Sequence, residues 1–563
     1  MLQRDCAADS ATPVSLAPRG LRTWQAVAVA LAGGLGLAAA FPPAGLWPLA
    51  AAGPALLAVA LWRRSLRGSF LVGLVFGIAF FAPLLSWVLN VAWYAWAALA
   101  AADTVIFAVL AIGQAMLLRM RAWPVAVAGW WVTAESLRDR WPWGGFPWGR
   151  LAMSQASAPT LRWVAVGGPS LLTFLLALAG ACLAWLILGS PARGSRNGSS
   201  RNRGELDQGL RARLRPRALP AVGLAAAVGV ALAGPLLPVD GGAPGTPTAV
   251  VAAVQGNVPR ARNLPDLLRA NTVTTNHAEA TLRLAARVRS GAVPAPDVVI
   301  WPENSTDQDP RLNPFIYSAI AQAVKAIDRP LLVGAVLQNP VRNSGQLWLP
   351  RRGPVGAYIK RRLVPFGEII PFRSFLDLFT SLPALQPVNF TPGHRAVVFH
   401  LGRIRLGDVI CYEVGFDGLV SSEVAAGANL LTVQTNDADF EIDGQTGETL
   451  QQLAMARVRA VEHDRAVVVA STTGVSAIIA PDGRLLAHTR IWQRATIEAR
   501  VPLRSQTTLA DRLGGWPEGI LTGATVAALA WMIAAAVGER RRRPGSEPPG
   551  ASPGPGRRDR AAE

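Results

Sequence analysis

Seven stretches of the chain are long enough and apolar enough to cross a lipid bilayer, and they limit the possible folds more than any other feature. A membrane helix needs about 20 mainly apolar residues, and each stretch approaches that length with almost no charge inside it. The stretches are residues 23–41, 46–62, 70–89, 97–118, 163–188, 219–237 and 519–537. A shorter eighth candidate, residues 123–137 with Glu135 near its end, makes the number of crossings even. The sequence therefore predicts a polytopic α-helical membrane domain of about eight helices.

Arginine is concentrated in every second segment that connects these stretches. The basic groups are Arg63, Arg64 and Arg67; Arg119 and Arg121; the eight arginines between Arg193 and Arg217; and Arg540 to Arg543. Arginines that flank membrane helices stay preferentially on the cytoplasmic side. We therefore expect the amino terminus inside the cell and the long segment before the last helix on the outer, periplasmic or extracytoplasmic, face of the cytoplasmic (inner) membrane.

These two patterns predict five parts of the chain. They are a cytoplasmic tail (residues 1–22), a membrane domain with seven helices (23–238) that includes an Arg-rich cytoplasmic loop (190–217), an extracytoplasmic domain (239–516, core 248–504), an eighth membrane helix (517–537) and a disordered basic cytoplasmic tail (538–563). The net charge of +19 is explained by the cytoplasmic arginines. Because no nucleic-acid-binding motif accompanies that charge, we expect a membrane partner and no nucleic acid.

The cysteines and histidines limit the chemistry further. The three cysteines are Cys6 in the amino-terminal tail, Cys182 inside an apolar stretch and Cys411 in the outer domain, so no two are expected to pair. The five histidines have no metal-ligand spacing, and we expect neither a metal nor another cofactor. Cys411 is then a lone thiol in an oxidising compartment, where it is a liability unless it is buried or used.

Short β-branched runs alternate with helical patterns between residues 248 and 504, which indicates an α/β domain. Three polar residues stand at or near the ends of such runs. Glu303 follows VVIWP, Lys360 lies in YIKRRLVPFGE with Glu368 eight positions later, and Cys411 ends GDVI. Polar residues at strand ends are candidates for a site.

Each of these residues has a plain structural explanation when it is taken alone. Glu303 would be a solvated loop residue, Cys411 a small core residue and Lys360 an accident of codon usage. Together they favour chemistry, because a thiolate attacks, a partly buried glutamate can take its proton, and an ammonium and helix-terminal amides would lower the thiol pKa from about 8.5. Lys360 is one of only two lysines, with Lys325, among 55 basic residues. A compact ammonium can approach an oxyanion where a guanidinium would occupy the space of the substrate.

Several sequence blocks resemble the nitrilase, or carbon-nitrogen hydrolase, superfamily and, more closely, its apolipoprotein N-acyltransferase family. The blocks are LSWVLN (85–90), GGFPWGRLAMSQ (144–155), VQGNVP (254–259), WPE (301–303), YIKRRLVPFGE (358–368), ICYE (410–413) and TND (435–437). The resemblance implies an αββα sandwich for the outer domain, with a Glu-Lys-Cys triad. It implies that Cys411 is the nucleophile, Glu303 the general base and Lys360 the group that stabilises the tetrahedral intermediate.

The resemblance also implies supporting residues and substrates. Glu368 would keep Lys360 charged, Tyr412 and Glu413 would stand beside the nucleophile, and Asn343 matches an asparagine of a preceding block. Trp148, with Trp141 and Trp143, would be a substrate rim or interfacial anchor, and a plain aromatic belt is an equal alternative. The implied reaction is ping-pong: a phospholipid donates an acyl chain to Cys411, and the α-amino group of a diacylated lipoprotein accepts it.

Two positions depart from the family pattern, and two other functions compete. Leu264 replaces a tryptophan of the lipid-facing pocket, and Glu441 replaces a glycine, so acyl-chain preference and loop motion are the properties in doubt. One competing function is a membrane-tethered amidase or nitrilase, in which water replaces the amine. The other is an inactive membrane scaffold for a partner enzyme, which would have no need of Glu303, Lys360 and Cys411.

Overall fold

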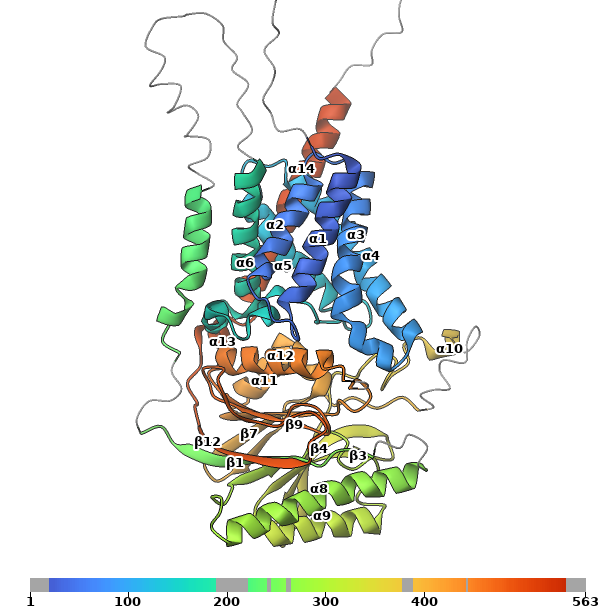
Figure 1. Cartoon of the computed structure of the whole chain (residues 1–563), viewed down its shortest axis with the longest axis vertical. Helices are drawn as coiled ribbons and strands as arrows, with labels where there is room; N and C mark the ends of the chain where they lie inside the picture. Colours follow the sequence, from blue (N-terminus) through green and yellow to red (C-terminus); the bar gives the residue numbers. More distant parts are fainter. Residues whose placement is uncertain are drawn as a thin grey trace, which may run out of the picture.

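The computed structural model describes residues 20–188, 221–239, 245–259, 265–376, 388–441 and 444–542. Within these residues a bundle of apolar helices stands on one side of a layered α/β domain (Figure 1). Cys6, Leu264, the Arg-rich loop 190–217 and residues 543–563 of the basic tail lie outside the described residues.

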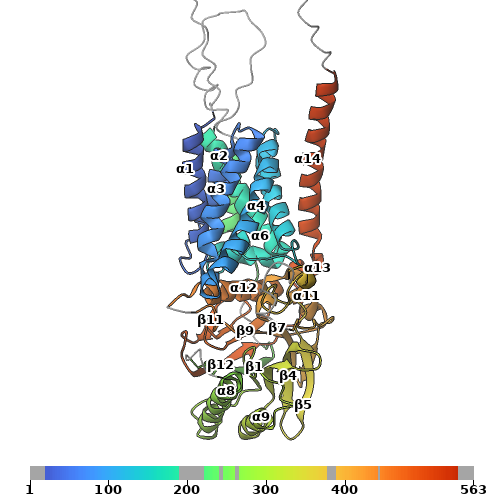
Figure 2. The same cartoon turned by 90° about the vertical axis from the view of Figure 1, so that its right-hand side faces the viewer.

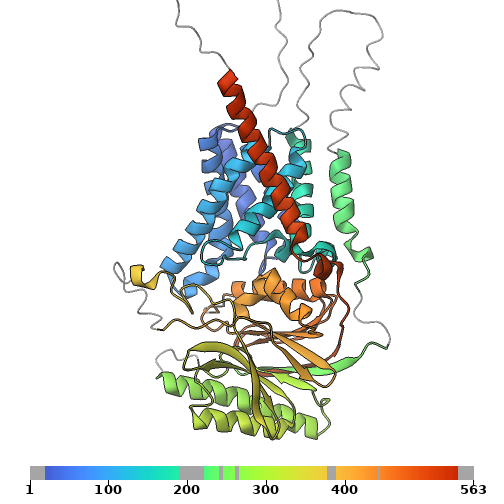
Figure 3. The ribbon, with the colours of Figure 1, turned by 180° about the vertical axis from the view of Figure 1, so that it is seen from behind.

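Each of the eight predicted apolar stretches forms a helix, but only five described helices are long and apolar enough to cross a membrane. These five are α1 (Thr23–Ala40), α3 (Leu66–Leu84), α4 (Trp93–Leu117), the segment Pro159–Leu188 that contains α6 (Val164–Leu188), and the apolar part of α14 (Trp516–Arg542). The shorter helices are α2 (Leu49–Leu61), α5 (Trp123–Arg138) and Ala221–Leu232. Helix α14 runs along the outside of the bundle (Figures 2 and 3).

Small residues allow the membrane helices to pack closely. A Cβ atom on Gly34 of α1 would lie 2.4 Å from the carbonyl oxygen of Phe76 on α3, and one on Gly73 of α3 would lie 2.5 Å from Cβ of Ala111 on α4. Lipid tails give apolar helices no hydrophobic reason to associate, so such close van der Waals contact supplies much of the stability.

The basic α2–α3 connection lies at the end of the bundle that is farthest from the α/β domain. The α2–α3 connection holds Arg64, whose Nη2 donates to the carbonyl oxygen of Leu21 just before α1. At the opposite end of α3, the 3₁₀ turn Ser86–Asn90 contacts the α/β domain: Asn90 Nδ2 donates to the Phe440 carbonyl at 2.6 Å. Because the carboxyl-terminal end of α3 faces the α/β domain, the α2–α3 connection at its amino-terminal end lies away from that domain.

The α/β domain contains two six-stranded sheets. The first has the order β12 (Ala495–Pro502), β1 (Thr248–Gln255), β2 (Val298–Ile300), β3 (Leu331–Leu337), β4 (Arg342–Leu349), β5 (Gly353–Ile359). The second has the order β11 (Leu485–His488), β10 (Ala477–Ile479), β9 (Ala466–Ser471), β8 (Leu430–Thr435), β7 (Ile404–Ile410), β6 (Val398–Leu401). Strands β1–β2–β3 and β7–β8–β9 are parallel, and the remaining neighbours are antiparallel.

Helices cover the outer face of each sheet, which confirms the predicted αββα sandwich. Helices α8 (Asp266–Arg289) and α9 (Pro314–Ile327) cover the first sheet, and α11 (Asp417–Ala425) and α12 (Gly447–His463) lie between the second sheet and the membrane helices (Figure 1). The described residues also form the short helices α10 (Arg373–Leu376) and α13 (Leu509–Leu513).

One apolar core joins the two parts of the molecule. It runs from Leu172 of α6 through Val458 of α12 to Val467 of β9, and all three side chains are fully or almost fully buried. A separate core, which includes Ile300 and Ile410, fills the space between the sheets. The sandwich is therefore packed against the helix bundle through α12, rather than tethered to it by the chain alone.

Candidate active site

Strands β2, β5 and β7 bring Glu303, Lys360 and Cys411 to one buried place in the sandwich. Glu303 follows the Trp-Pro that ends β2, Lys360 directly follows β5, and Cys411 directly follows β7. Lys360 Nζ lies 2.8 Å from Glu303 Oε1 and 3.0 Å from Glu368 Oε1, and its side chain is 1% exposed. The ammonium is therefore held between two carboxylates and away from bulk water.

Asn343 on β4 ties these two carboxylates together. Its Nδ2 donates to Glu303 Oε1 at 2.6 Å and to Glu368 Oε1 at 2.8 Å. The other oxygen of Glu303 accepts from the backbone N–H of Asn436 at 3.1 Å, and that of Glu368 accepts from the backbone N–H of Val364 at 2.8 Å. Both carboxylates are thus fixed in position by the protein around them.

Burial and neighbouring charges shift the pKa of both partners. Burial raises the pKa of Glu303 above its ordinary value, although Lys360 acts in the opposite direction. Burial alone would lower the pKa of Lys360, but Glu303, Glu368 and Cys411 outweigh it and hold that pKa well above the usual range. Lys360 therefore stays charged, and Glu303 is a stronger base than an exposed glutamate.

Cys411 is the first residue of the 3₁₀ turn Cys411–Gly415 and has a positive φ of 53°, which is uncommon for a side chain with a Cβ. Burial and Glu303 raise the pKa of its thiol, and Lys360 only partly opposes them. The expectation of a lowered thiol pKa is therefore wrong. Removing this thiol from water favours its neutral form more strongly than the neighbouring ammonium favours the thiolate.

Glu413 and Tyr412 hold the turn that carries Cys411. Glu413 is fully buried, and its carboxylate accepts four hydrogen bonds of 2.6–2.9 Å. Three of the donors are backbone N–H groups, those of Ile410 just before Cys411 and of Arg361 and Arg362 just after Lys360; the fourth is Tyr358 Oη. Tyr412 Oη donates to the carbonyl oxygen of Gly145, in the loop between α5 and α6, at 2.5 Å. Glu413 therefore ties the Lys360 and Cys411 segments together, and Tyr412 ties the turn to the membrane domain.

Trp141, Trp143 and Trp148 in the α5–α6 loop do not share one environment. Trp148 is 3% exposed, and its ring stacks on Tyr412 with centroids 5.6 Å apart. Trp141 and Trp143 are 58% and 50% exposed. Trp148 is thus part of the wall behind the Cys411 turn, and only the other two have the exposure of interfacial anchors.

Comparison with known proteins agrees with this geometry. Residues 33–182 match a family model described as the apolipoprotein N-acyltransferase N-terminal domain, and residues 251–510 match one described as carbon-nitrogen hydrolase. The apolipoprotein N-acyltransferase of Mycolicibacterium smegmatis is 38% identical over 517 residues, which cover 89% of this chain and 84% of that protein. The chain belongs to the apolipoprotein N-acyltransferase family.

A second relative covers a similar share of the chain. The apolipoprotein N-acyltransferase of Azotobacter vinelandii is 30% identical over 552 residues, covering 91% of this chain and 95% of that protein. A solved amidase from Nesterenkonia sp. overlaps 46% of this chain and 91% of its own, with 17% identity and a TM-score of 0.34. As a member of the apolipoprotein N-acyltransferase family, this chain is a membrane acyltransferase.

Two residues of α12 that act on Cys411, Gln452 and Glu448, were not predicted from the sequence of this N-acyltransferase-family chain. Gln452 on α12 donates from Nε2 to Cys411 Sγ at 3.6 Å and to Glu448 Oε1 at 3.1 Å. Glu441, one of the two positions that depart from the family pattern, is 2% exposed. Burial and the neighbouring Asp437 raise the pKa of its carboxyl to about 9. Glutamine and glutamate are both common on helix surfaces, so only the packing of α12 marks Gln452 and Glu448. Among the described residues, no group of three His, Cys, Asp or Glu side chains has the arrangement of a metal site.

Proposed function

We propose that this chain moves an acyl chain from a phospholipid to the α-amino group of the amino-terminal diacylglyceryl-cysteine of lipoproteins. The observation that carries this proposal is the buried Lys360 ammonium, held by Glu303 and Glu368 beside Cys411. The site lies against a loop of the membrane domain, where two substrates that are anchored by acyl chains can reach it. The names of the relatives support the same activity.

In the first half of the proposed reaction, Cys411 becomes acylated. Its sulfur attacks the ester carbonyl of the phospholipid while Glu303 takes the thiol proton, which is necessary because the thiol rests neutral. Lys360 Nζ stabilises the oxyanion of the tetrahedral intermediate. The intermediate breaks its bond to the glycerol oxygen, which takes the proton from Glu303, and a lysophospholipid leaves an acyl thioester on Cys411.

In the second half, an amine takes the place of the lost alcohol. The uncharged α-amino group attacks the thioester carbonyl, and Glu303 accepts a proton from the attacking nitrogen. The second intermediate breaks its carbon–sulfur bond, and the sulfur recovers the proton from Glu303. The products are an amide and the free thiol, and the greater stability of the amide drives this half forward. The ping-pong order follows from the use of one nucleophile for both halves.

We also propose the orientation and the five-part division of the chain given by the arginine pattern. The α2–α3 connection, with its arginines, would face the cytoplasm, so the sandwich (within residues 239–516) would lie on the outer face of the cell membrane. The contact of Asn90 with Phe440 supports this arrangement, because it places the sandwich at the end of α3 opposite the α2–α3 connection. The acyl donor and acceptor are then lipids of the outer leaflet.

The decisive assay for this function combines purified full-length protein, phospholipid and a synthetic diacylated lipopeptide in mixed micelles. Mass spectrometry should find the lipopeptide heavier by one acyl chain, and an otherwise identical peptide with an acetylated amino terminus should remain unchanged. Cys411→Ala should abolish the product. Release of free fatty acid without acylated lipopeptide would overturn the proposal in favour of a hydrolase, and activity in Cys411→Ala would overturn the role of that residue.

A further inference from the structure

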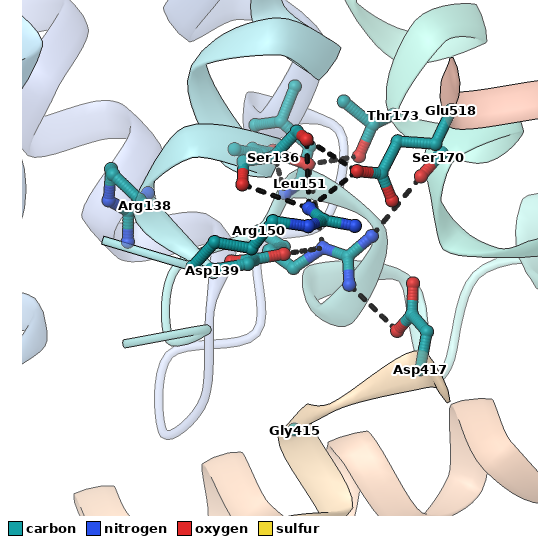
Figure 4. A network of polar contacts seen from close by, with 12 residues as sticks. Ser136, Arg138, Asp139, Arg150, Leu151, Ser170, Thr173, Gly415, Asp417 and Glu518 are labelled. Carbon is teal, nitrogen blue, oxygen red and sulfur yellow. Dashed lines mark hydrogen bonds and ion pairs between the residues drawn. The ribbon is translucent and has the colours of Figure 1, made fainter. Parts of the chain in front are cut away.

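A buried arginine in the α5–α6 loop connects the membrane domain to the segment just after the nucleophile (Figure 4). Arg150 Nη1 lies 2.7 Å from Asp417 Oδ1, and Nε lies 3.2 Å from Asp139 Oδ2 and 3.7 Å from Glu135 Oε2. Its Nη2 donates to Ser170 Oγ on α6 at 3.4 Å. The side chain of Arg150 is 3% exposed and that of Asp417 is 26% exposed, so the arginine is shielded from water while its pair with Asp417 is partly buried.

The same oxygen of Asp417 also binds a second buried arginine. Arg459 on α12 has its Nη2 2.7 Å from Asp417 Oδ1, and its side chain is 1% exposed. Its Nη1 pairs with Glu462 Oε2 at 2.6 Å. Burial acts to raise the pKa of Asp417, but Arg150 and Arg459 outweigh it and hold that pKa below its ordinary value. Asp417 is thus an anion that separates two cations.

Arg459 in turn holds the backbone of the nucleophile turn. Its Nε donates to the carbonyl oxygen of Val414 at 2.8 Å, and Nη2 donates to that of Gly415 at 2.9 Å. The membrane loop approaches the same turn from outside, since a Cβ atom on Gly415 would lie 2.5 Å from Pro147 Cγ. Cys411, which begins this turn, adopts its uncommon positive φ within this frame.

From these contacts we propose that Asp417 is a positioning residue for Cys411. Its carboxylate joins Arg150 of the membrane domain to Arg459 of α12, and Arg459 fixes the carbonyl groups that follow the nucleophile. Without that charge, the two guanidinium groups would repel each other across a buried space, and Arg459 would move away from the Val414 and Gly415 carbonyls. The proposal rests on the proposed function only in taking Cys411 as the nucleophile.

Two aspartate variants test whether the charge of Asp417 positions the sulfur. Asp417→Asn should lower the rate constant for acylation of Cys411 by phospholipid about 100-fold, as expected for a misplaced reacting atom, with the phospholipid KM within about twofold of its normal value. Asp417→Glu keeps the charge and should retain more than about a tenth of the rate. The matched control is Glu279→Gln, which breaks an exposed ion pair with Arg283 and should leave the rate unchanged.

A second reaction separates this proposal from the acyl-transfer function. Iodoacetamide modification of the Cys411 peptide, followed by mass spectrometry, needs no lipid. It should slow about tenfold in Asp417→Asn, because the displaced thiol loses Glu303 as its base. The positioning role would be overturned if Cys411 in Asp417→Asn were alkylated at the normal rate. It would also be overturned if Asp417→Asn and Asp417→Glu lost the same share of the acylation rate. Both conclusions hold whether or not the lipopeptide is acylated. If iodoacetamide modifies Cys411 of the unaltered protein at the expected rate but the lipopeptide is not acylated, only the proposed acyl-transfer function is overturned.

Arg459→Lys keeps the test decisive if Asp417→Asn does not fold. Lysine preserves a charge opposite Asp417, but a single ammonium does not reproduce the planar fork that reaches both carbonyl groups. The expected result is a folded protein, judged by gel filtration and apparent Tm, whose Cys411 acylation is at least about tenfold slower. Acylation at the normal rate in folded Arg459→Lys would contradict the proposal.

Discussion

The environment of Lys360 accounts for a lysine in a chain that otherwise relies on arginine. Its ammonium fits between Glu303 and Glu368 at 2.8 and 3.0 Å, and the side chain is almost completely buried. A guanidinium is broader and would have to displace one carboxylate or enter the space of the substrate. Size and hydrogen-bond geometry, and not charge alone, therefore select the residue at this position.

Lys360→Arg should consequently inactivate the enzyme while leaving it folded. Loss of a well-placed donor to the oxyanion lowers kcat by about 10²- to 10³-fold, and overpacking costs about 1–3 kcal/mol of stability. The measurement is the initial rate of lipopeptide acylation. The control is Lys325→Arg at the exposed position on α9, which should act like the unaltered protein. Comparable rates for the two variants would contradict the proposed role of Lys360.

The raised pKa of Glu303 predicts the acid limb of the pH profile. The base works only as carboxylate, so acylation of Cys411 should decline as pH falls through the pKa of Glu303. Because burial raises that pKa, the decline should begin at a higher pH than the ordinary glutamate value of 4.5 would give. The single-turnover rate of Cys411 acylation measured against pH provides the test. If the midpoint of the decline lay at or below pH 4.5, Glu303 would be excluded as the group that titrates. The same conclusion would follow if Glu303→Gln showed the same decline in rate at low pH.

Sequence reasoning identified polar residues at strand ends but not their electrostatic state. Glu303, Lys360 and Cys411 stood out because each follows an apolar strand, and the structure brings them together with Glu368 and Asn343. The predicted direction of the shift in the thiol pKa of Cys411 was wrong, because that shift depends on how completely the folded chain excludes water from the sulfur. Gln452 gave no signal, since its contact with Cys411 spans 41 positions and depends on how α12 docks.

At the scale of elements, strand β3 must pass very close to the turn that carries Glu303. A Cβ atom on Gly334 would lie 2.1 Å from the carbonyl oxygen of Pro302 and 2.7 Å from Cα of Glu303. Backbone atoms cannot yield as a flexible side chain can, so any side chain at Gly334 must push the Glu303 turn away. This glycine is therefore a requirement of the site, although it carries no chemical group.

Gly334→Ala should lower the rate of Cys411 acylation about 100-fold, because a shift of about 1 Å in a reacting group has an effect of that size. Gly356→Ala is the matched control on β5 of the same sheet, where the added Cβ would make an ordinary contact of 3.6 Å with Phe399. The comparison uses acylation rates of the two purified variants. An unimpaired Gly334→Ala enzyme would contradict the packing argument.

The positions of the helices could be predicted from the sequence more fully than the pairing of the strands. Apolar length located all eight helices, but α2 and the helix Ala221–Leu232 are shorter than the predicted stretches 46–62 and 219–237. Hydropathy registers apolar residues in the flanking turns as readily as those in the helix. Alternation of strands and helices indicated an α/β domain, and the resemblance supplied the sandwich. The pairing of β12 with β1 joins segments about 250 positions apart, and no local pattern specifies it.

At the scale of the whole molecule, the sandwich and the helix bundle form one packed body. Apolar contacts through α12 join them, and so does the ion pair between the buried Arg150 and the partly buried Asp417. The sequence indicated a membrane domain and an outer domain, but it did not indicate that a loop of the first would contact the turn of the second that carries Cys411. The membrane helices thus have two roles, anchoring the enzyme and completing the environment of Cys411.

The proposed orientation can be tested with single introduced cysteines and a membrane-impermeant maleimide on intact cells. Arg484→Cys in the β10–β11 turn and Arg121→Cys in the α4–α5 connection replace exposed side chains. Position 484 should be labelled in intact cells, and position 121 only after permeabilisation, because the arginine-rich ends are expected in the cytoplasm. The opposite labelling pattern would reverse the orientation and remove the outer-leaflet lipids as substrates.

The most direct test of the central claim is the mass of the Cys411 peptide after the purified protein has been incubated with phospholipid alone. The account predicts an added acyl chain on Cys411 that hydroxylamine removes. Addition of a diacylated lipopeptide should then discharge it, with one acylated lipopeptide formed for each thioester lost. Efficient lipopeptide acylation without any adduct on Cys411, or an adduct that the lipopeptide does not discharge, would contradict the account.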